Sequence, residues 1–420
     1  MVDSKKETLA VSFYSGGYAK TIIRIVMLPL VPLLLVLACD SPDGGLLQVP
    51  RLPCSPLELW DGTAFLVVLG WCLLQCALYL LPMGTVAEGT PLKSGKRLKY
   101  NLNGVQAYLA SMGLVALAYG AGLDLTIVAE RYLQLLVSAI LLGAVVSLLL
   151  YIKSFSAPIT ELVPEGNTGR VISDYYMGRE LNPKIGDLDL KFVFMMRVGF
   201  LSWGPIHACM LAWAFKTYGY LPLPLILITI FHVTYAADLV LEEDFDLTTR
   251  ESISTGLGYA VVCGELTWVP FVYIIQAYFL LRHPQPLSWP GAAAIAALFF
   301  IGFWIYRSSN AEKNGFRKNP NHPDYAYLQK ISTAHGKSLL VSGWWGWLRH
   351  PNYLGDIIMA VAWALPCGVS HLAPYVYLLF CITILVERDA VDEEDCRRKY
   401  GPAWLEYCRR VKYRIVPYVY

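Results

Sequence analysis

Charged residues are scarce in this chain of 420 residues. Asp, Glu, Lys and Arg make up 16% of it, against about a quarter of a typical soluble domain, while apolar residues make up 56%. So little charge excludes a string of ordinary soluble domains. The net charge of +2 gives no indication of nucleic-acid binding. The composition therefore predicts an integral membrane protein.

Several sequence signatures are also absent. The chain has no CxxC pair, no HExxH motif, no N-x-S/T sequon, no internal repeat and no evident cleavable signal peptide. It has ten cysteines, most of them inside apolar stretches, and it is too long and too hydrophobic for a small disulfide-stapled domain. We interpret the cysteines as packing residues and expect no metal site.

Long apolar runs, in contrast, are abundant. A transmembrane helix needs about 20 mostly apolar residues. The sequence therefore predicts an all-α, polytopic membrane bundle of about ten transmembrane helices. Basic residues gather on one side of this arrangement, which places both termini in the cytoplasm by the positive-inside rule. The predicted spans are 21–39, 64–83, 105–123, 132–152, 193–216, 221–240, 257–281, 291–306, 355–370 and 373–387.

A polar cluster precedes the ninth of these spans. The segment 342–356 places Arg349, His350, Asn352 and Tyr353 beside three tryptophans. An interfacial aromatic belt with snorkelling cations explains the tryptophans, but it does not explain the Arg-His-Pro-Asn-Tyr run at the start of a helix. A helix N-terminus flanked by Arg and Asn suits a phosphate or another anion. We therefore predict a cofactor site in the polar stretch from Arg307 to Tyr353.

Two further pairs of charged residues lie nearby in the sequence. Lys313 and Arg317 are four residues apart, so on a helix they would share one face, where they would either anchor the preceding span or bind a 2′-phosphate or pyrophosphate. Arg388 and Asp392 have the same spacing in a charged helix that continues the last span. They form either a simple ion pair or, through Asp392, a site for a nucleotide ribose.

Acidic residues gather at the end of the sixth span, in the segment 238–251. Carboxylates in or beside a membrane are energetically costly and are candidates for function by default. We expect most of this segment to be solvated. Asp238 lies deepest, which makes it the candidate proton donor, and Tyr235 is a second group that donates a proton or orients a substrate hydroxyl.

Together these segments resemble the sterol reductase family, and its delta-14-sterol reductase and lamin B receptor branch most. The resemblance covers the chain from about Val86 to Tyr420. Its most specific motifs are Gly178–Lys191 (GRELNPKIGDLDLK), Leu339–Asp356 (LLVSGWWGWLRHPNYLGD), Ala362–Gly368 (AWALPCG) and Tyr413–Tyr420 (YRIVPYVY). The resemblance implies a membrane domain over residues 21–420, preceded by a cytoplasmic segment 1–20, in which residues from about 300 to 420 form an NADPH pocket. The implied pocket positions are Lys313, Arg317, Leu340, Trp345, Asn352, Tyr353, Asp392, Cys396, Tyr400 and Tyr407.

The reaction implied by the resemblance is reduction of the sterol carbon-14 double bond, in which a protein acid protonates the alkene and NADPH delivers hydride. The sequence departs from the family on the acid side. Glu242, Glu243 and Asp244 replace a family His-Glu-Glu, and Ser254 and Thr255 replace a His-Asp. A catalytically impaired structural or sterol-binding relative is therefore an alternative.

A membrane methyltransferase is a second alternative, because that class also carries a short Arg-His-Pro-x-Tyr segment. The expected location is the endoplasmic reticulum membrane, with the inner nuclear membrane as the other option. The expected partners are a sterol substrate and the lipid bilayer. Nuclear-envelope proteins or further copies of the chain are also compatible with the sequence, whereas nucleic acid is not an expected partner.

Overall fold

The chain folds into two compact units. The computed structural model describes residues 17–41, 55–91, 95, 97–247, 249–333, 336 and 338–420. The N-terminal unit contains Gly16–Pro286 and Val369–Pro374, and the C-terminal unit contains Leu287–Gly368 and Tyr375–Tyr420. Most of the predicted cytoplasmic segment 1–20 lies outside the described residues. The assignment of residues 21–420 to one membrane domain stays a prediction.

The predicted all-α, polytopic fold is confirmed. Each of the ten predicted segments coincides with a helix or with a run of consecutive helices. Among the described residues, six helices are long and apolar enough to cross a membrane, and the bent pair Tyr259–Val272 and Ile275–Arg282 forms a seventh candidate. The other three predicted segments are helical, but their helices are not among these candidates. Gly104–Gly120 is a shorter apolar helix, Pro351–Ala364 has 14 residues, and Val376–Tyr400 becomes highly charged toward its end.

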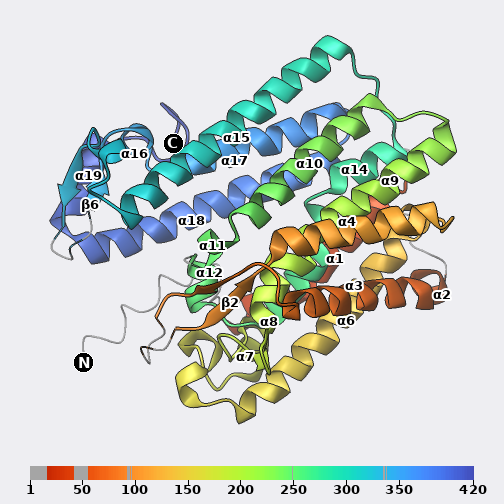
Figure 1. Ribbon diagram of the computed structural model, residues 1–420, viewed down its shortest axis with the longest axis horizontal. Coiled ribbons are helices and arrows are strands. Elements are labelled where there is room, and N and C mark those ends of the chain that lie inside the picture. The colour runs from red at the N-terminus through yellow and green to blue at the C-terminus, as the bar shows by residue number, and fades with distance from the viewer. Residues whose placement is uncertain are drawn as a thin grey trace. The chain divides into compact units, whose positions relative to one another are not determined.

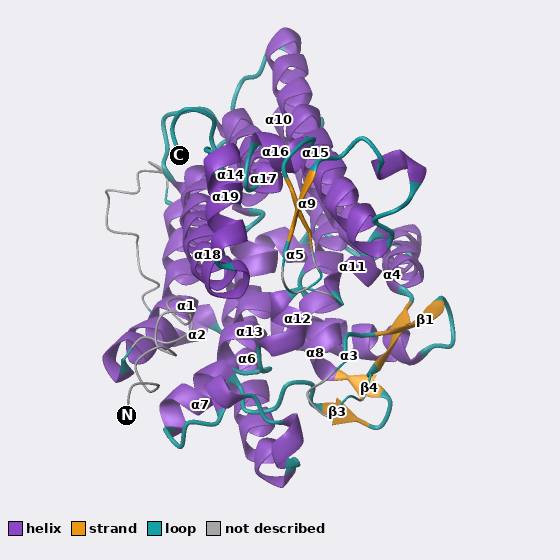
Figure 2. Cartoon of the chain, turned by 90° about the vertical axis from the view of Figure 1, so that its left-hand side faces the viewer, coloured by secondary structure: helices purple, strands orange, loops and turns teal. Residues whose placement is uncertain are grey.

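Helices dominate the N-terminal unit, and among its described residues the strands form two short antiparallel hairpins, β1–β2 and β3–β4 (Figure 2). A buried apolar cluster of Leu78, Ala107, Leu201 and Val240 joins helices α3, α4 and α10 to the segment before α9. The main elements are α1 (Tyr18–Cys39), α2 (Pro56–Leu59), α3 (Gly62–Leu80), β1 (Thr85–Glu88), β2 (Lys99–Leu102), α4 (Gly104–Gly120), α5 (Ile127–Glu130), α6 (Tyr132–Lys153), α7 (Val171–Met177), β3 (Lys184–Ile185), β4 (Leu188–Asp189), α8 (Leu190–Val193), η4 (Phe194–Val198), η5 (Phe200–Ser202), α9 (Trp203–Tyr218), α10 (Leu223–Leu241), α11 (Glu243–Asp246), α12 (Arg250–Ser254), α13 (Tyr259–Cys263), η6 (Gly264–Val272) and α14 (Ile275–Arg282).

Two spans of this unit contain π-helical segments, η4 and η6. Pro270 lies within η6. Because proline has no backbone N–H and its ring clashes with the preceding turn, a regular α-helix does not continue undisturbed through it. π-Helical segments often occur at functional sites. Each of these two segments holds one ionisable side chain, Arg197 in η4 and Glu265 in η6.

The C-terminal unit is built on three helices, in which α17 lies against both α15 and α18 (Figure 1). A short hairpin, β5–β6, and two small helices lie between or after them. The polar stretch that begins at Arg307 is partly helical, because α15 continues through Lys318. The elements are α15 (Trp289–Lys318), β5 (Lys330–Ser332), β6 (Ser338–Leu340), α16 (Trp344–Trp347), α17 (Pro351–Ala364), η8 (Leu365–Cys367), α18 (Val376–Tyr400) and α19 (Pro402–Arg410).

Two glycines allow α15 and α17 to approach closely. A Cβ atom on Gly355 would lie 2.7 Å from the carbonyl oxygen of Gly302 and 2.7 Å from the backbone nitrogen of Tyr306. A Cβ atom on Gly302 would lie 2.9 Å from the carbonyl oxygen of Gly355. No side chain fits at this crossing without moving one helix away from the other, so the glycines set the spacing between α15 and the start of α17.

Replacing Gly355 with alanine should therefore push α15 and α17 apart. Overpacking of this kind typically costs about 1–3 kcal/mol, and we expect the melting temperature of the detergent-solubilised protein to fall. Gly113→Ala is the matched control, because α4 has open space at that position and alanine is the better helix former. Equal melting temperatures for the two variants would contradict the close approach of these helices.

Candidate active site

Lys313 and Trp345 form the centre of the candidate site in the C-terminal unit. The Lys313 Nζ atom lies over the Trp345 ring, 3.7 Å from its centroid. The indole N–H of Trp345 donates to the carbonyl oxygen of Ser309, at 2.8 Å, which fixes the ring against α15. A cation held against an indole face is stabilised there, and the pair fixes the Lys313 amino group at a defined position beside α16.

Helix α18 places two residues near Lys313. Lys313 interacts electrostatically with Arg317 on its own helix and with Asp392 and Cys396 on α18. Burial and the nearby Asp392 carboxylate raise the pKa of the Cys396 thiol to about 11, so the thiol is neutral at physiological pH. Lys313 on α15 and Asp392 on α18, which are far apart in the sequence, therefore lie near each other in the C-terminal unit.

The β5–β6 hairpin also contributes residues to the candidate site. Successive side chains of a strand point to opposite faces, and the hairpin uses both. Leu340 packs in a cluster with Phe316, Leu328 and Trp345. Its neighbour Leu339 packs in a second cluster, whose other members are Trp404, Tyr407, Val411, Ile331, Val341, Cys396, Tyr400 and Cys408.

The second cluster is tied to the first through Tyr407. Its hydroxyl donates to the carbonyl oxygen of Trp345, at 3.1 Å. Burial raises the pKa of the Tyr407 hydroxyl, so it stays a neutral donor. The predicted residues Leu340, Trp345, Cys396, Tyr400 and Tyr407 thus belong to two joined clusters, in which α19 packs beside the hairpin.

Asn352 and Tyr353 stand in the first turn of α17. The Oδ1 atom of Asn352 is buried and has no hydrogen-bond partner among the described residues. Buried polar atoms are normally paired, so this oxygen is a site for a ligand donor. The ring of Tyr353 stacks on His350, with centroids 4.5 Å apart and planes 8° apart.

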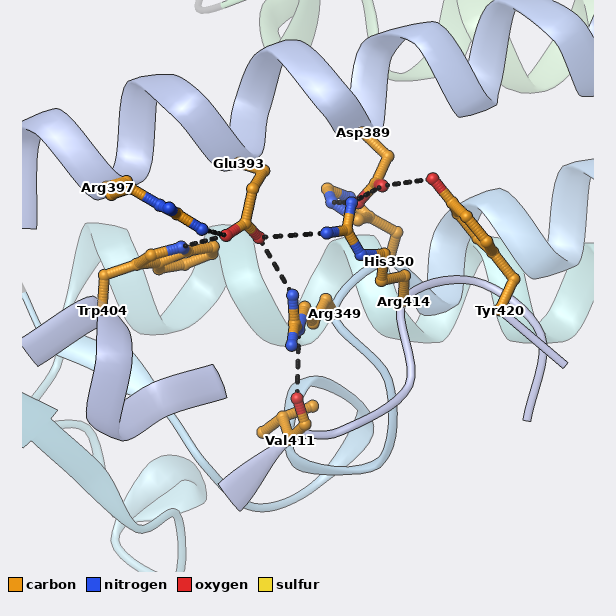
Figure 3. Close-up of polar contacts among 9 residues, drawn as sticks. All are labelled: Arg349, His350, Asp389, Glu393, Arg397, Trp404, Val411, Arg414 and Tyr420. Carbon is orange, nitrogen blue, oxygen red and sulfur yellow. Dashed lines mark hydrogen bonds and ion pairs between the residues drawn. The ribbon is translucent and has the colours of Figure 1, made fainter. Parts of the chain in front are cut away.

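Arg349 and His350 are bound to carboxylates of α18 (Figure 3). Arg349 donates to Glu393 Oε2, at 2.9 Å, and to the carbonyl oxygen of Val411, at 3.0 Å. His350 Nε2 lies 3.1 Å from Oδ1 of Asp389. The predicted role of Arg349 in binding a cofactor stays a prediction, and in the structure its guanidinium binds groups of the protein.

Asp389 carries a negative charge over the whole physiological range. Burial acts to raise its pKa, but hydrogen bonds from His350 and Arg414 outweigh burial and lower the pKa to about 2. A carboxyl pKa lowered by folding stabilises the fold above the unfolded-state value, near 4, and this stabilisation is lost only as the pH falls toward 2. Sequence reasoning did not select Asp389 or Glu393, since both belong to a charged helix that looks like a solvated face.

Arg388, the other member of the predicted pair with Asp392 on α18, interacts electrostatically with Asp356 on α17. The side chain of Arg388 is exposed, whereas Asp392 is half-buried. The interaction of Asp392 with Lys313 favours the second of the two sequence interpretations, in which this carboxylate belongs to a binding site.

The candidate acid residues lie in the N-terminal unit, on α10. Asp238 is buried, with 9% of its surface exposed. The ring of Tyr235 stacks on Trp203, with centroids 6.0 Å apart, and the Trp203 indole donates to the carbonyl oxygen of Val269 in η6, at 2.9 Å. Residues three apart share one face of a helix, so Tyr235 and Asp238 present their groups on the same side of α10.

The expectation that most of the acidic segment is solvated is wrong. Only Asp244 is exposed among the acidic residues from Asp238 to Glu251. Glu243 accepts from the fully buried Arg197, at 2.9 Å, and from the backbone N–H of Gly104, also at 2.9 Å. For Glu243 the reason is pairing with Arg197, because η4 supplies a cation that no local sequence pattern reveals.

Glu265 is a further carboxyl that sequence reasoning missed. Its Oε2 atom is buried and has no hydrogen-bond partner among the described residues. Gly199 makes room for it, because a Cβ atom there would lie 2.6 Å from that oxygen. A single carboxylate in the apolar stretch 257–281 was the available signal, since such residues are rare in spans and usually functional.

The sequence as a whole has clear relatives. Residues 18–420 match the model of the Ergosterol biosynthesis ERG4/ERG24 family. A Delta(14)-sterol reductase of Mus musculus is 45% identical over 405 residues, which are 96% of this chain and 97% of the relative. A Delta(14)-sterol reductase of Gallus gallus is 44% identical over 95% of this chain, which spans 63% of that longer protein. A third, from Schizosaccharomyces pombe, is 38% identical over 86% of each chain.

These matches confirm the resemblance drawn from the motifs. They cover almost the whole chain and both of its units. The chain belongs to the ERG4/ERG24 family of sterol reductases, and it is a multi-pass membrane protein.

Proposed function

We propose that this protein is an NADPH-dependent reductase of the sterol carbon-14 double bond that acts in sterol biosynthesis. The observation that carries the proposal is the 45% identity to a Delta(14)-sterol reductase over 96% of the chain. The clustering of the predicted cofactor residues around Lys313 and Trp345 supports it. The competing methyltransferase hypothesis is dropped, because family membership assigns the shared Arg-His-Pro-x-Tyr segment to a reductase.

The residues of the C-terminal unit fit a phosphorylated dinucleotide. Lys313 and Arg317 supply two cations on one face of α15, as a phosphate ligand requires. Trp345 and Tyr353 offer aromatic faces, and the buried Asn352 oxygen would be satisfied by an amide or hydroxyl donor of a ligand.

The chain's own chemical task is to supply a proton. NADPH, when bound, supplies the hydride. We assign the general acid to Asp238, which would give its proton to one carbon of the alkene, and the orienting hydroxyl to Tyr235. The other alkene carbon would take the hydride that bound NADPH supplies, and water would return a proton to the Asp238 carboxylate.

A catalytically impaired sterol-binding protein is the second candidate. Glu242, Asp244 and Ser254 replace residues expected in the family, and Glu243 is bound to Arg197. If these differences remove turnover, the protein would bind NADPH or sterol and form no product. Detection of a sterol that has lost its carbon-14 double bond would exclude this candidate.

Complementation of a yeast strain lacking its delta-14-sterol reductase tests the proposal. We expect the expressed protein to restore growth and to lower the carbon-14-unsaturated sterol, and Asp238→Asn to fail at similar expression. Persistence of the unsaturated sterol in cells with well-expressed wild-type protein would contradict the proposed activity. We also propose that the protein resides in the endoplasmic reticulum membrane or the inner nuclear membrane, with both termini in the cytoplasm.

A further inference from the structure

Two carboxylates one turn apart on α18 bind two consecutive residues at the start of α17. Asp389 lies 3.1 Å from His350 Nε2, and Glu393 accepts from Arg349 at 2.9 Å (Figure 3). Residues four apart on a helix point the same way, which matches the carboxylates to neighbouring partners. Asp389 is only 1% exposed, so water does not compete for its oxygens. The register of α17 against α18 is therefore fixed by two parallel contacts.

The C-terminal tail, residues 411–420, is part of the same network. Arg414 donates to Asp389 Oδ2, at 2.7 Å, and its second terminal nitrogen lies 3.9 Å from Glu393. The hydroxyl of Tyr420 also donates to Asp389 Oδ2, at 3.0 Å. One buried carboxylate thus holds three side chains, two of which come from the tail.

Backbone hydrogen bonds join the tail to the segment before α17. The N–H of Arg349 donates to the carbonyl oxygen of Tyr413, at 3.0 Å, and the N–H of His350 donates to that of Arg414, at 2.8 Å. These bonds bring the tail alongside the residues that immediately precede Asn352 and Tyr353. A shift of the tail would therefore move the first turn of α17.

His350 links this network to Tyr353, one of the residues proposed to bind the cofactor. One edge of its ring contacts Asp389, and its face lies parallel to Tyr353 at 4.5 Å. A ring held by a carboxylate has a fixed orientation, and a ring stacked on it loses rotational freedom. Asn352, with its buried and unpartnered oxygen, is placed by the same helical turn.

We propose that Asp389 is a positioning residue for the cofactor, which orients His350 and the tail so that Asn352 and Tyr353 are pre-arranged for a nicotinamide dinucleotide. The inference rests on the proposed function, because it takes the cofactor class from it. Asp389 acts through His350 and Arg414 and contacts no reacting atom. Its effect should therefore appear in cofactor binding before it appears in the chemical step.

The test uses purified full-length protein with Asp389→Asn, Asp389→Glu and Asp395→Asn. Asp395 is the matched control, since it lies on the same helix and pairs with an exposed arginine, Arg398, at 2.9 Å. We expect Asp389→Asn to raise the Kd for NADPH by about 10- to 100-fold, as misplaced binding groups do, with a rise in KM for NADPH larger than the fall in kcat. Asp389→Glu, which keeps the charge, should recover most of the affinity.

A second readout separates positioning from loss of folding. Limited proteolysis should cleave the tail of Asp389→Asn faster than that of Asp395→Asn, while NADPH at saturation restores protection. Wild-type affinity in Asp389→Asn, or equal losses in the aspartate and control variants, would overturn the inference. Failure of the proposed function looks different, since the wild-type protein would then bind NADPH without reducing the sterol, or would not bind it at all.

Discussion

Replacing Lys313 with methionine is expected to weaken NADPH binding by about 10- to 100-fold. A hydrogen bond to a charged group contributes about 1.5–3 kcal/mol, and methionine keeps the length of the side chain while removing the charge. The ammonium of Lys313 lies over Trp345, near Arg317 and Asp392, so its loss leaves the site without its central cation. Direct titration of the purified protein with NADPH measures the effect.

The same titration distinguishes the two phosphate assignments for this cation. If Lys313 binds the 2′-phosphate, Lys313→Met should weaken NADPH binding and leave the affinity for NADH unchanged. If it binds the pyrophosphate, both cofactors lose affinity equally. Lys318→Met is the control, because Lys318 is exposed at the end of the same helix. Unchanged NADPH affinity in Lys313→Met would remove Lys313 from the cofactor site.

Asp238→Asn is expected to lower kcat by about 10²- to 10⁴-fold, the range attributed to a general acid. Asparagine has nearly the same size, so the buried site on α10 keeps its shape while the transferable proton is lost. NADPH affinity should not change, since the proposed cofactor residues belong to the C-terminal unit. Turnover of delta-14 sterol at saturating NADPH, together with the melting temperature, is the measurement.

Three companion variants make this experiment decisive. Asp244→Asn is the control, because Asp244 is the exposed member of the acidic segment. Tyr235→Phe tests the orienting hydroxyl. Glu265→Gln tests the carboxyl in η6, whose Oε2 is buried and has no hydrogen-bond partner among the described residues. Full turnover in Asp238→Asn with a large loss in Glu265→Gln would move the acid role to η6.

The sequence predicts the helices of this fold well, because an apolar run of span length has few other uses. It predicts their ends less well. The end of α15 at Lys318 was not foreseen, since charged residues after Arg307 suggest a loop until Phe316 is known to pack against Leu340. The π-helical segments were not foreseen either, because widening one turn leaves the apolar composition of the span unchanged.

Some residues of the candidate site were selected from the sequence, and others were not. The sequence pattern selected Lys313, Arg317, Asn352 and Tyr353, since their residue types suit phosphate and lie where a helix begins or ends, and their role in binding a cofactor stays a prediction. The carboxylates that hold the site were not selected. Asp389 and Glu393 lie about 40 residues from Arg349 and His350 in the sequence, and only tertiary packing reveals which acids of α18 are buried.

Transfer of deuterium from labelled NADPH to sterol would show directly whether this protein reduces the carbon-14 double bond. The purified protein would be incubated in lipid nanodiscs with a carbon-14-unsaturated sterol and NADPH that carries deuterium at both hydrogens of the nicotinamide C4 position, and the sterol would be analysed by mass spectrometry. We expect one deuterium in each saturated sterol, with one NADPH consumed per product, and loss of product in Asp238→Asn. NADPH binding without any deuterated sterol would contradict the proposed activity.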